Sequence, residues 1–323
     1  MKTPTPETIA AAAQCLRDGG LVAIPTETVY GLGADASNPQ AVLRIFAAKG
    51  RPADHPLIVH AAGAESLEYW AREVPEGALR LAARYWPGPL TLILKRGRAP
   101  LEVTGGQDSV GLRVPAHPVA LALLRAFGGG VAAPSANRFG RVSPTRAWHV
   151  RRELGDRVDM ILDGGPCRVG VESTILSLAG DRPVLLRPGA IALSELQEVL
   201  GEEIAPPSTP VAIRAPGMLA SHYAPETPFE VWPAEELRQR AEELAQTGRR
   251  AAILFIDPQR CGIAATPDLL PFPMPAEPDD YARRLFAVLR RFDRMGLDVL
   301  LAEAPPETEA WQAVRDRMRR ASC

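Results

Sequence analysis

The chain has 323 residues, with 37 basic and 38 acidic side chains and a formal net charge of -1 at pH 7. This length predicts about two domains, each large enough to bury its own core. The neutral balance excludes a protein whose whole surface binds nucleic acid or membrane, so any polyanion site must be local. Two features of the composition are unusual, because only three basic residues are lysines (Lys2, Lys49 and Lys95) and prolines number 32.

The sequence shows no segment expected to enter a membrane. Its longest aliphatic runs, such as residues 251–256, have the length of a strand, whereas a membrane span needs roughly 20 apolar residues. Residues 1–20 favour an amphipathic helix over a secretory signal, so we expect a cytoplasmic protein. The cysteines are far apart, which argues against a disulfide framework or a zinc site: Cys15, Cys167, Cys261 and Cys323.

Short apolar runs alternate with helical patterns through the first two thirds of the chain. This alternation is typical of a layered α/β fold with one large sheet. A helix is expected over 39–48, where Asn38 can cap it and Pro39 suits its first turn. Strands are predicted at 21–24, 57–59, 90–94, 110–114, 131–133, 160–162, 174–178 and 184–186, and further helices near 64–72, 76–86, 117–127, 145–153 and 194–200.

A proline-rich segment divides the chain into two predicted domains. Prolines between 206 and 228 interrupt any helix or central strand, so this segment is expected to be a semi-rigid linker. Residues 1–205 form the first predicted domain and residues 229–323 a smaller α/β domain. In the second, strands are expected near 231, 251–256 and 299–301, and helices near 234–247, 279–295 and 307–320.

Residues 31–36 match the G-x-G-x-x-A pattern of dinucleotide-binding proteins, with Asp54 about 20 residues further on. In such proteins the glycines form the turn that leads directly from a strand to a helix. Here residues 25–30 separate the glycines from the strand, and no long helix begins at Ala36. The sequence around the glycines therefore argues against a dinucleotide site. The chain also has no P-loop motif.

Residues 49–52, Lys-Gly-Arg-Pro, follow the helix predicted at 39–48. The glycine and proline fix a turn that can hold two cations beside a phosphate chain. The alternative is a helix that ends in favourable positive charge. The scarcity of lysine gives Lys49 weak additional support for the phosphate role.

The loop at residues 133–145 is rich in hydroxyl, amide and glycine groups, which suit phosphates or nucleosides. It can equally be a turn in which Ser143 or Thr145 caps the next helix. Arg113 lies in an otherwise apolar strand, where it needs either an anionic ligand or a structural carboxylate. His60 follows a strand and can be a ligand or a packed core histidine.

Together, the ordered segments of this chain closely resemble the threonylcarbamoyl-AMP synthase family in its long form. That family has a YrdC-like catalytic domain, a twisted open mixed sheet with helices, followed by a smaller Rossmann-like α/β accessory domain. The resemblance is strong over about residues 8–226 and rests on residues 25–33, 49–52, 56–60, 135–137, 171–175, 187–189, 216–218 and 221–225.

The resemblance implies that L-threonine, bicarbonate and ATP are converted to L-threonylcarbamoyl-AMP and pyrophosphate. This intermediate serves the formation of threonylcarbamoyladenosine next to the anticodon of tRNA, so tRNA and downstream transfer proteins are possible partners. Such chemistry depends on positioning and on neutralising charge. Mg²⁺ is expected to arrive with ATP, without a dedicated protein metal site.

The resemblance also implies site residues, with Lys49 and Arg51 as catalytic groups. Arg113 would hold the threonine carboxylate, and the linker with Tyr223 would close over the nucleotide as a lid. The expected threonine pocket consists of Thr28, His60, Arg113, Ala133 and Ser173. The expected ATP site consists of Lys49, Arg51, His55, Ser109, Ser135, Asn137, Ser143, Arg187 and Tyr223.

Three positions depart from the family pattern. His55 replaces the usual asparagine, Phe139 replaces a common serine, and Ser109 replaces threonine while keeping its hydroxyl. Two other functions fit the same fold. One is a non-catalytic module that binds double-stranded RNA or tRNA, against which the neutral charge argues. The other is a carbamoyltransferase of the hydrogenase-maturation type.

Overall fold

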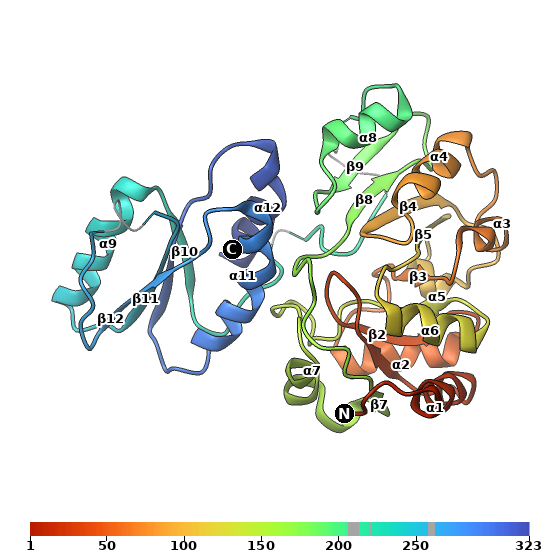
Figure 1. The fold of residues 1–323 in the computed structure, drawn as a ribbon, viewed down its shortest axis with the longest axis horizontal. Coiled ribbons are helices and arrows are strands. Elements are labelled where there is room, and N and C mark those ends of the chain that lie inside the picture. Colours follow the sequence, from red (N-terminus) through yellow and green to blue (C-terminus); the bar gives the residue numbers. More distant parts are fainter. Residues whose placement is uncertain (206–212, 220, 258–261, 323) are drawn as a thin grey trace. The chain divides into compact units, whose positions relative to one another are not determined.

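The structure is a computed structural model that describes residues 1–205, 213–219, 221–257 and 262–322. The chain forms two compact units. Unit 1 comprises Met1–Phe139 and Ser143–Met218, and unit 2 comprises Gly140–Val142 and Leu219–Cys323 (Figure 1). Within the linker predicted at 206–228, residues 206–212 and 220 lie outside the described residues. Of the remainder, 213–218 belong to unit 1, and 219 and 221–228 belong to unit 2.

Unit 1 contains a nine-stranded mixed sheet with the order β7-β1-β2-β6-β3-β5-β4-β8-β9. Its strands agree with the predicted runs, with the addition of β2. The neighbours β3 and β5 are parallel, whereas β6 runs antiparallel to both β2 and β3. The strands are β1 (Val22–Ile24), β2 (Gly31–Asp35), β3 (Ile58–His60), β4 (Leu90–Lys95), β5 (Ser109–Arg113), β6 (Val131–Ala132), β7 (Met160–Ile161), β8 (Thr174–Ser177) and β9 (Val184–Arg187).

Helices pack on both faces of this sheet, which explains why its central strands are buried almost continuously. Helices α1 and α6 pack against each other and bury one face of β1 together with Val131. The main core lies on the other face, where α2 and α4 contribute buried side chains. The helices are α1 (Pro6–Arg17), α2 (Pro39–Lys49), α3 (Leu67–Trp70), α4 (Glu76–Tyr85), α5 (Leu101–Thr104), α6 (Pro118–Phe127), α7 (Ala147–Leu154) and α8 (Leu193–Leu200).

Helix α2 positions the Lys-Gly-Arg-Pro turn. The Asn38 side chain accepts hydrogen bonds from the first turn, and Pro39 occupies the N-terminal position, as the sequence predicted. The helix ends at Lys49, and its C-cap is Gly50, whose φ of 62° lies in the left-handed region that glycine adopts readily. This residue reverses the chain and places Lys49 and Arg51 on either side of the turn.

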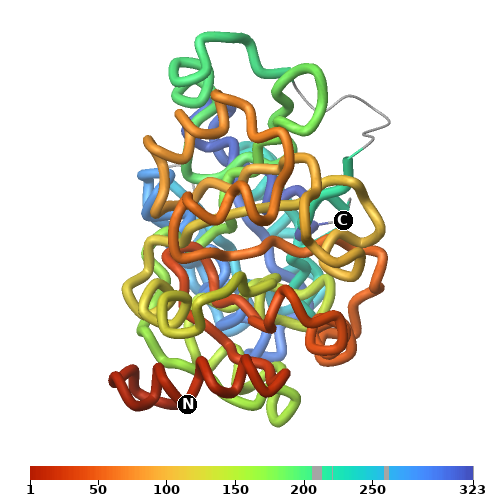
Figure 2. Tube along the Cα trace, turned by 90° about the vertical axis from the view of Figure 1, so that its right-hand side faces the viewer, coloured from red at the N-terminus to blue at the C-terminus, as the bar shows by residue number. Residues whose placement is uncertain are grey.

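The G-x-G pattern lies inside strand β2, which confirms that it is no strand-to-helix turn. A Cβ atom at Gly33 would lie 2.8 Å from a Val131 methyl carbon, so glycine lets β2 and β6 approach closely. At the edge of the sheet Lys2 forms a bridge with Leu162, and Figure 2 shows the N-terminal segment in red beside the green segment near residue 160.

Residues 213–218 cover part of the sheet of unit 1. Ile213, Ala215 and Met218 pack on a hydrophobic cluster formed by side chains of β3, β4, β8 and β9. The Arg214 backbone N–H donates to the Gln107 side chain at 2.7 Å, and its guanidinium donates to the Gly105 carbonyl at 2.9 Å. This part of the predicted linker therefore belongs to the body of unit 1.

Unit 2 is a parallel four-stranded sheet with the order β10-β13-β11-β12, and helices cover both of its faces (Figure 1). Helix α9 buries Leu237, Ala241 and Leu244 against one face, and α11 and α12 lie on the other. The elements are β10 (Phe229–Trp232), α9 (Ala234–Gln246), β11 (Ala251–Phe255), β12 (Leu269–Pro273), α11 (Pro278–Phe292), β13 (Val299–Glu303) and α12 (Gln312–Ala321).

Strand β12 was not predicted, because its sequence contains two prolines, which are typical of loops. Pro271 and Pro273 are tolerated because β12 is an edge strand, where a missing N–H breaks no ladder on the outer side. The fold class is otherwise as expected, with a large mixed sheet and a separate smaller parallel sheet. Among the described residues, no helix combines the length and the hydrophobicity needed to cross a membrane.

Candidate active site

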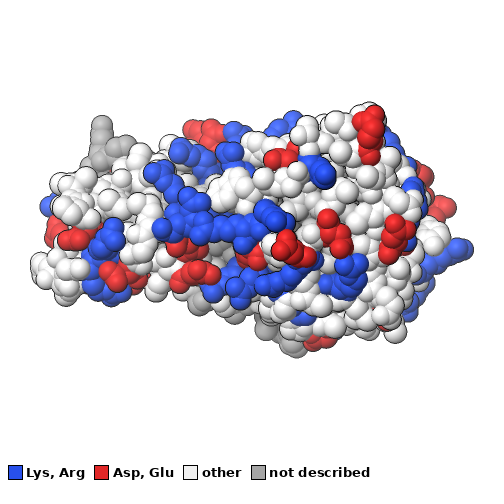
Figure 3. Space-filling view, turned by 90° about the horizontal axis from the view of Figure 1, so that it is seen from below, with Lys and Arg blue, Asp and Glu red and all other residues white. Residues whose placement is uncertain are grey.

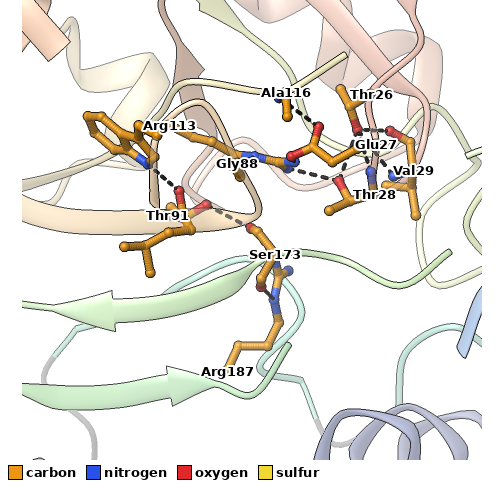
Figure 4. A network of polar contacts seen from close by, with 12 residues as sticks. Thr26, Glu27, Thr28, Val29, Gly88, Thr91, Arg113, Ala116, Ser173 and Arg187 are labelled. Atoms are coloured by element: carbon orange, nitrogen blue, oxygen red, sulfur yellow. Dashed lines mark hydrogen bonds and ion pairs between the residues drawn. The ribbon is translucent and has the colours of Figure 1, made fainter. Parts of the chain in front are cut away.

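The first feature of the site is a buried guanidinium at the carboxyl end of β5. Arg113 is 4% exposed, and its Nη2 lies 2.6 Å from Glu27 Oε1 (Figure 4). Its Nη1 donates to Thr28 Oγ1 at 2.9 Å and its Nε donates to the Gly88 carbonyl at 3.2 Å. The structural carboxylate that the sequence left open is therefore Glu27.

The loop between β1 and β2 presents Glu27 and Thr28 to this arginine. Thr26 Oγ1 donates to the Val29 carbonyl at 2.5 Å, and it also lies 2.9 Å from Thr28 Oγ1. Since the single hydroxyl proton of Thr26 goes to Val29, Thr28 donates to Thr26 and accepts from Arg113. The hydrogen bonds therefore run in one direction, from Arg113 through Thr28 to Thr26.

His60 ends β3 and stands in register with Arg113 on the neighbouring parallel strand β5. It is 3% exposed, and its Nδ1 lies 3.3 Å from the Ile58 carbonyl. Burial, followed by the nearby charge of Arg113, lowers the pKa of His60 to about 3. His60 is therefore a neutral imidazole at physiological pH.

Ser173 connects this pocket to β4 and β9. Its Oγ lies 2.7 Å from Thr91 Oγ1 and accepts from Arg187 Nη2 at 3.1 Å (Figure 4). Arg187 also donates through Nε to the Ser173 carbonyl at 3.0 Å and through Nη1 to the Pro216 carbonyl at 2.9 Å. Arg187 thereby joins the pocket to residues 213–218.

A second loop is fixed against the Glu27–Thr28 loop by backbone hydrogen bonds. The Val169 N–H donates to the Glu27 carbonyl at 2.7 Å, and the Gly170 N–H donates to the Thr28 carbonyl at 3.1 Å. Two residues after Gly170 comes Glu172, which accepts from the Ser143 hydroxyl, and Ser173 follows it. Ser143 therefore does not cap α7, whose N-cap is Arg146 without a side-chain hydrogen bond.

Lys49 is the centre of a second cluster. Its buried ammonium donates to the carbonyls of Ser135 and Asn137, both at 2.5 Å, and its own carbonyl accepts from the Phe139 N–H at 2.9 Å. Burial, followed by the charge of Arg51, holds the pKa of Lys49 well below its ordinary value. Lys49 thus holds the loop at residues 135–139 on both sides.

Arg51 lies on the opposite side of the Gly50 turn. Its Nη2 donates to the Pro56 carbonyl at 2.9 Å, and its guanidinium lies 5.7 Å from the centre of the Phe139 ring. His55 meets the same ring edge to face. Burial, followed by the charge of Arg51, lowers the pKa of His55.

The remaining predicted residues are distributed more widely. Ala133 follows β6 and donates its N–H to the Ile58 carbonyl at 3.0 Å, which places it beside β3. Ser109 begins β5, whereas Arg113 ends it, so the two are separated by about 13 Å of strand. Tyr223 belongs to unit 2, where it is 1% exposed, adopts a φ of 65° and stacks on Phe286 with ring centres 5.6 Å apart.

Comparison with known proteins places the chain in a family. The family model described as "Telomere recombination" matches residues 14–189, and the one described as "Threonylcarbamoyl-AMP synthase, C-terminal domain" matches residues 191–323. A threonylcarbamoyl-AMP synthase from Pyrococcus abyssi is 44% identical over 97% of this chain and 94% of the relative. The Bacillus subtilis protein of the same name is 42% identical over 97% of this chain and 92% of the relative. The chain belongs to the threonylcarbamoyl-AMP synthase family.

A solved member of the synthase family has the same fold. The crystal structure of P. abyssi Sua5 complexed with L-threonine superposes with a TM-score of 0.90 at 42% identity, covering 99% of this chain and 96% of that one. The predicted family and fold class are confirmed. The names of the relatives favour an enzyme over a non-catalytic RNA-binding module.

Three polar residues of this candidate synthase site were not predicted individually. Glu27 carries the ion pair of Arg113, Thr91 bonds Ser173, and Glu172 bonds Ser143. The signal for Glu27 was present in the sequence, because a buried arginine in an apolar strand needs a carboxylate, but many carboxylates qualified. Thr91 gave no signal, because threonine is an ordinary strand residue.

Proposed function

We propose that the chain is an L-threonylcarbamoyl-AMP synthase, a nucleotidyltransferase that uses L-threonine, bicarbonate and ATP. The observation that carries the proposal is the buried Arg113 network in a chain that belongs to this family. The product would supply the first step of threonylcarbamoyladenosine formation next to the anticodon of tRNA. The remaining steps would need a separate enzyme that transfers the threonylcarbamoyl group.

The threonine pocket is proposed to form around Arg113. The guanidinium carries five N–H groups, of which three are engaged by Gly88, Thr28 and Glu27. The two that remain lie on different terminal nitrogens and can together donate to the two oxygens of a carboxylate. Neutral His60 can bond a polar substrate group without adding charge. The proposed pocket is Thr28, His60, Arg113, Ala133 and Ser173.

The ATP site is proposed to use the turn after α2 and the loop after β6. Arg51 would face the phosphates, and Lys49 would hold the carbonyls of Ser135 and Asn137 while its third N–H remains for a phosphate. Tyr223 is included only because of the resemblance to the synthase family. The full proposed set is Lys49, Arg51, His55, Ser109, Ser135, Asn137, Ser143, Arg187 and Tyr223.

The proposed chemistry is a displacement at phosphorus. The threonine amine combines with the carbon of bicarbonate, with loss of water, to form a carbamate. A carbamate oxygen then attacks the α-phosphorus of ATP, the bond to the β-phosphate oxygen breaks, and pyrophosphate leaves. Because the carbamate and ATP are both anionic, the chain contributes mainly orientation and positive charge.

Magnesium is proposed to be bound through the phosphates of ATP. No group of three or more His, Cys, Asp or Glu side chains is arranged to hold a metal ion in the described part of the chain. Bound to ATP, magnesium would reduce the negative charge on the phosphates.

The test is a reaction of purified protein with labelled bicarbonate, L-threonine, ATP and magnesium. We expect a labelled carbamoyl-adenylate and pyrophosphate, both dependent on threonine. Absence of product with all components present would refute the proposal. Labelled carbamoyl phosphate in place of bicarbonate and threonine tests the carbamoyltransferase alternative, and it should give no product.

We also propose tRNA as a partner, through an arginine face on α11. Figure 3 shows basic side chains gathered over this helix. At 100° per residue, the four arginines within α11 fall within an arc of about 120°, and a fifth follows the end of the helix. They are Arg283, Arg284, Arg290, Arg291 and Arg294. Residues 219–323 otherwise carry an acidic excess, with 14 arginines, no lysine and 17 acidic residues in total.

Two of these arginines also frame an aromatic ring. Arg284 and Arg291 lie 5.7 and 5.3 Å from the centre of the Phe272 ring, which is partly exposed. Replacement of both arginines by glutamine should weaken tRNA binding. It should also reduce the slope of log K against log salt concentration by about the amount expected for two lost phosphate contacts. The control is Arg238→Gln on α9, which breaks an exposed pair with Glu242. Equal tRNA binding by the double variant and the control would refute this surface.

A further inference from the structure

Both carboxylate oxygens of Glu27 accept hydrogen bonds. Oε1 accepts from Arg113 Nη2 at 2.6 Å, and Oε2 accepts from the Ala116 N–H at 3.0 Å. The side chain is almost completely removed from solvent, with 3% of the residue exposed. Its own backbone carbonyl is held by the Val169 N–H at 2.7 Å. The carboxylate therefore has little freedom to move, and it fixes the arginine on one side.

The Arg113 guanidinium is held in its plane at three points. Glu27, Thr28 and Gly88 each accept one of its N–H groups, and each is held by its own hydrogen bonds or by the backbone. Glu27 provides the only charged contact among the three. Without it, the guanidinium would keep two neutral acceptors and could rotate about its last side-chain bonds.

We propose that Glu27 is a positioning residue for L-threonine binding, because it orients Arg113 so that one N–H of each terminal nitrogen faces the substrate carboxylate. This inference rests on the proposed function of Arg113 as the threonine clamp. The benefit is pre-organisation, since a guanidinium that is already oriented loses less freedom when the ligand binds.

A purely neutralising role for Glu27 predicts the opposite sign. A carboxylate next to Arg113 cancels part of the positive potential that attracts an anionic ligand. If neutralisation alone mattered, removal of this charge would strengthen threonine binding or leave it unchanged. If orientation dominates, removal weakens threonine binding even though the pocket becomes more positive. The direction of the change therefore distinguishes the two roles.

The discriminating variant is Glu27→Gln. Its amide has the same shape, but it has one acceptor oxygen and one NH₂ donor. It can accept from Arg113 or from the Ala116 N–H, but not from both. A buried carboxylate partner lost in this way lowers affinity by about tenfold to a hundredfold. Burial raises the pKa of Glu27, but the charge and the hydrogen bond of Arg113 outweigh this effect and hold the pKa below its ordinary value. The wild-type carboxyl group is therefore ionised under assay conditions.

The experiment measures L-threonine binding by calorimetry without ATP, and then KM for threonine and for ATP separately. For Glu27→Gln we expect the threonine Kd and KM to rise roughly tenfold or more, with the ATP KM changed less than about twofold. The matched control is Glu230→Gln, which breaks a Glu–Arg pair of 2.9 Å with Arg240 in unit 2, outside the pocket. The Glu230→Gln variant should change neither the threonine Kd nor the KM for either substrate.

Threonine binding that is unchanged or tighter in a folded Glu27→Gln variant overturns the inference. Should that variant not fold, Glu27→Asp takes its place, because it keeps the charge but withdraws it by one methylene, and unchanged threonine affinity there overturns the inference equally. Failure of the proposed function is a separate result. It would be seen in the wild-type protein as absence of the carbamoyl-adenylate, whatever the variants do to threonine binding.

Discussion

The rings of His55 and Phe139 meet edge to face, with centres 5.2 Å apart and planes inclined at 76°. These are two of the positions at which the sequence departs from the family pattern. The Arg51 guanidinium lies against the same Phe139 ring. The two departures are therefore neighbours in space, and Phe139 also contacts Arg51 of the proposed ATP site.

Replacement of either ring should disturb the other. We expect Phe139→Ser and His55→Asn each to raise the KM for ATP by about twofold to fivefold, because the Phe139 ring supports Arg51 and His55 packs against that ring. The double variant should show less than the sum of the two effects, with a coupling of about 0.5–1 kcal/mol. Steady-state kinetics measure this, and the threonine KM serves as an internal control. Strictly additive effects would contradict a shared role.

Lys49 should contribute to stability as well as to ATP binding. Lys49→Met leaves the carbonyls of Ser135 and Asn137 without their donor, so the free energy of unfolding should fall by about 2–4 kcal/mol. Denaturant unfolding measures this change. Lys95→Met, at an exposed lysine paired with Glu73, should cost less than about 1 kcal/mol. Equal stability of both variants would mean that Lys49 acts only on phosphate.

His60 should make the protein less stable in mild acid. Its pKa is about 3 when folded and about 6.5 when unfolded, so the unfolded chain binds the extra proton more readily. This contribution is complete above pH 6.5 and is lost as the pH falls from 6.5 towards 3. Between pH 7 and 5 the wild type should lose about 2 kcal/mol more than His60→Gln. Parallel losses in both proteins would argue against a buried neutral His60.

Thr91 should affect threonine binding through Ser173. Thr91→Val keeps the shape of the side chain but removes the hydroxyl that lies 2.7 Å from Ser173 Oγ. We expect a loss of about 1–2 kcal/mol in threonine affinity, whereas Thr91→Ser should retain it. Calorimetric titration with threonine provides the measurement. Wild-type affinity in the valine variant would show that Arg187 alone orients Ser173.

Arg113→Ala should raise the threonine requirement far more than the ATP requirement, whereas Tyr223→Ala should act mainly on ATP. Arg113→Lys should resemble the alanine variant, because an ammonium cannot form the same planar, forked contacts. The two KM values, measured for each variant in one assay, decide the matter. Similar effects of each variant on both substrates would count against the pocket assignments.

The sequence predicted the elements whose signal is local. Asn38 and Pro39 start α2 and Gly50 ends it, because capping depends on neighbours a few residues apart. The alternation of strands and helices predicted the fold class, and the ordered motifs predicted the family. Strand β12 was missed because its prolines signal a loop unless the strand is known to lie at an edge.

The sequence by itself determined that Arg113 needs an anion and that several polar loops belong to one site. Only the tertiary structure decided that its partner is Glu27, 86 positions away, and that Thr91 meets Ser173 across 82 positions. The physical reason is that such pairs depend on strand order. Strand β5 lies between β3 and β4, and β8 follows β4, an arrangement created by long-range pairing that no local pattern encodes.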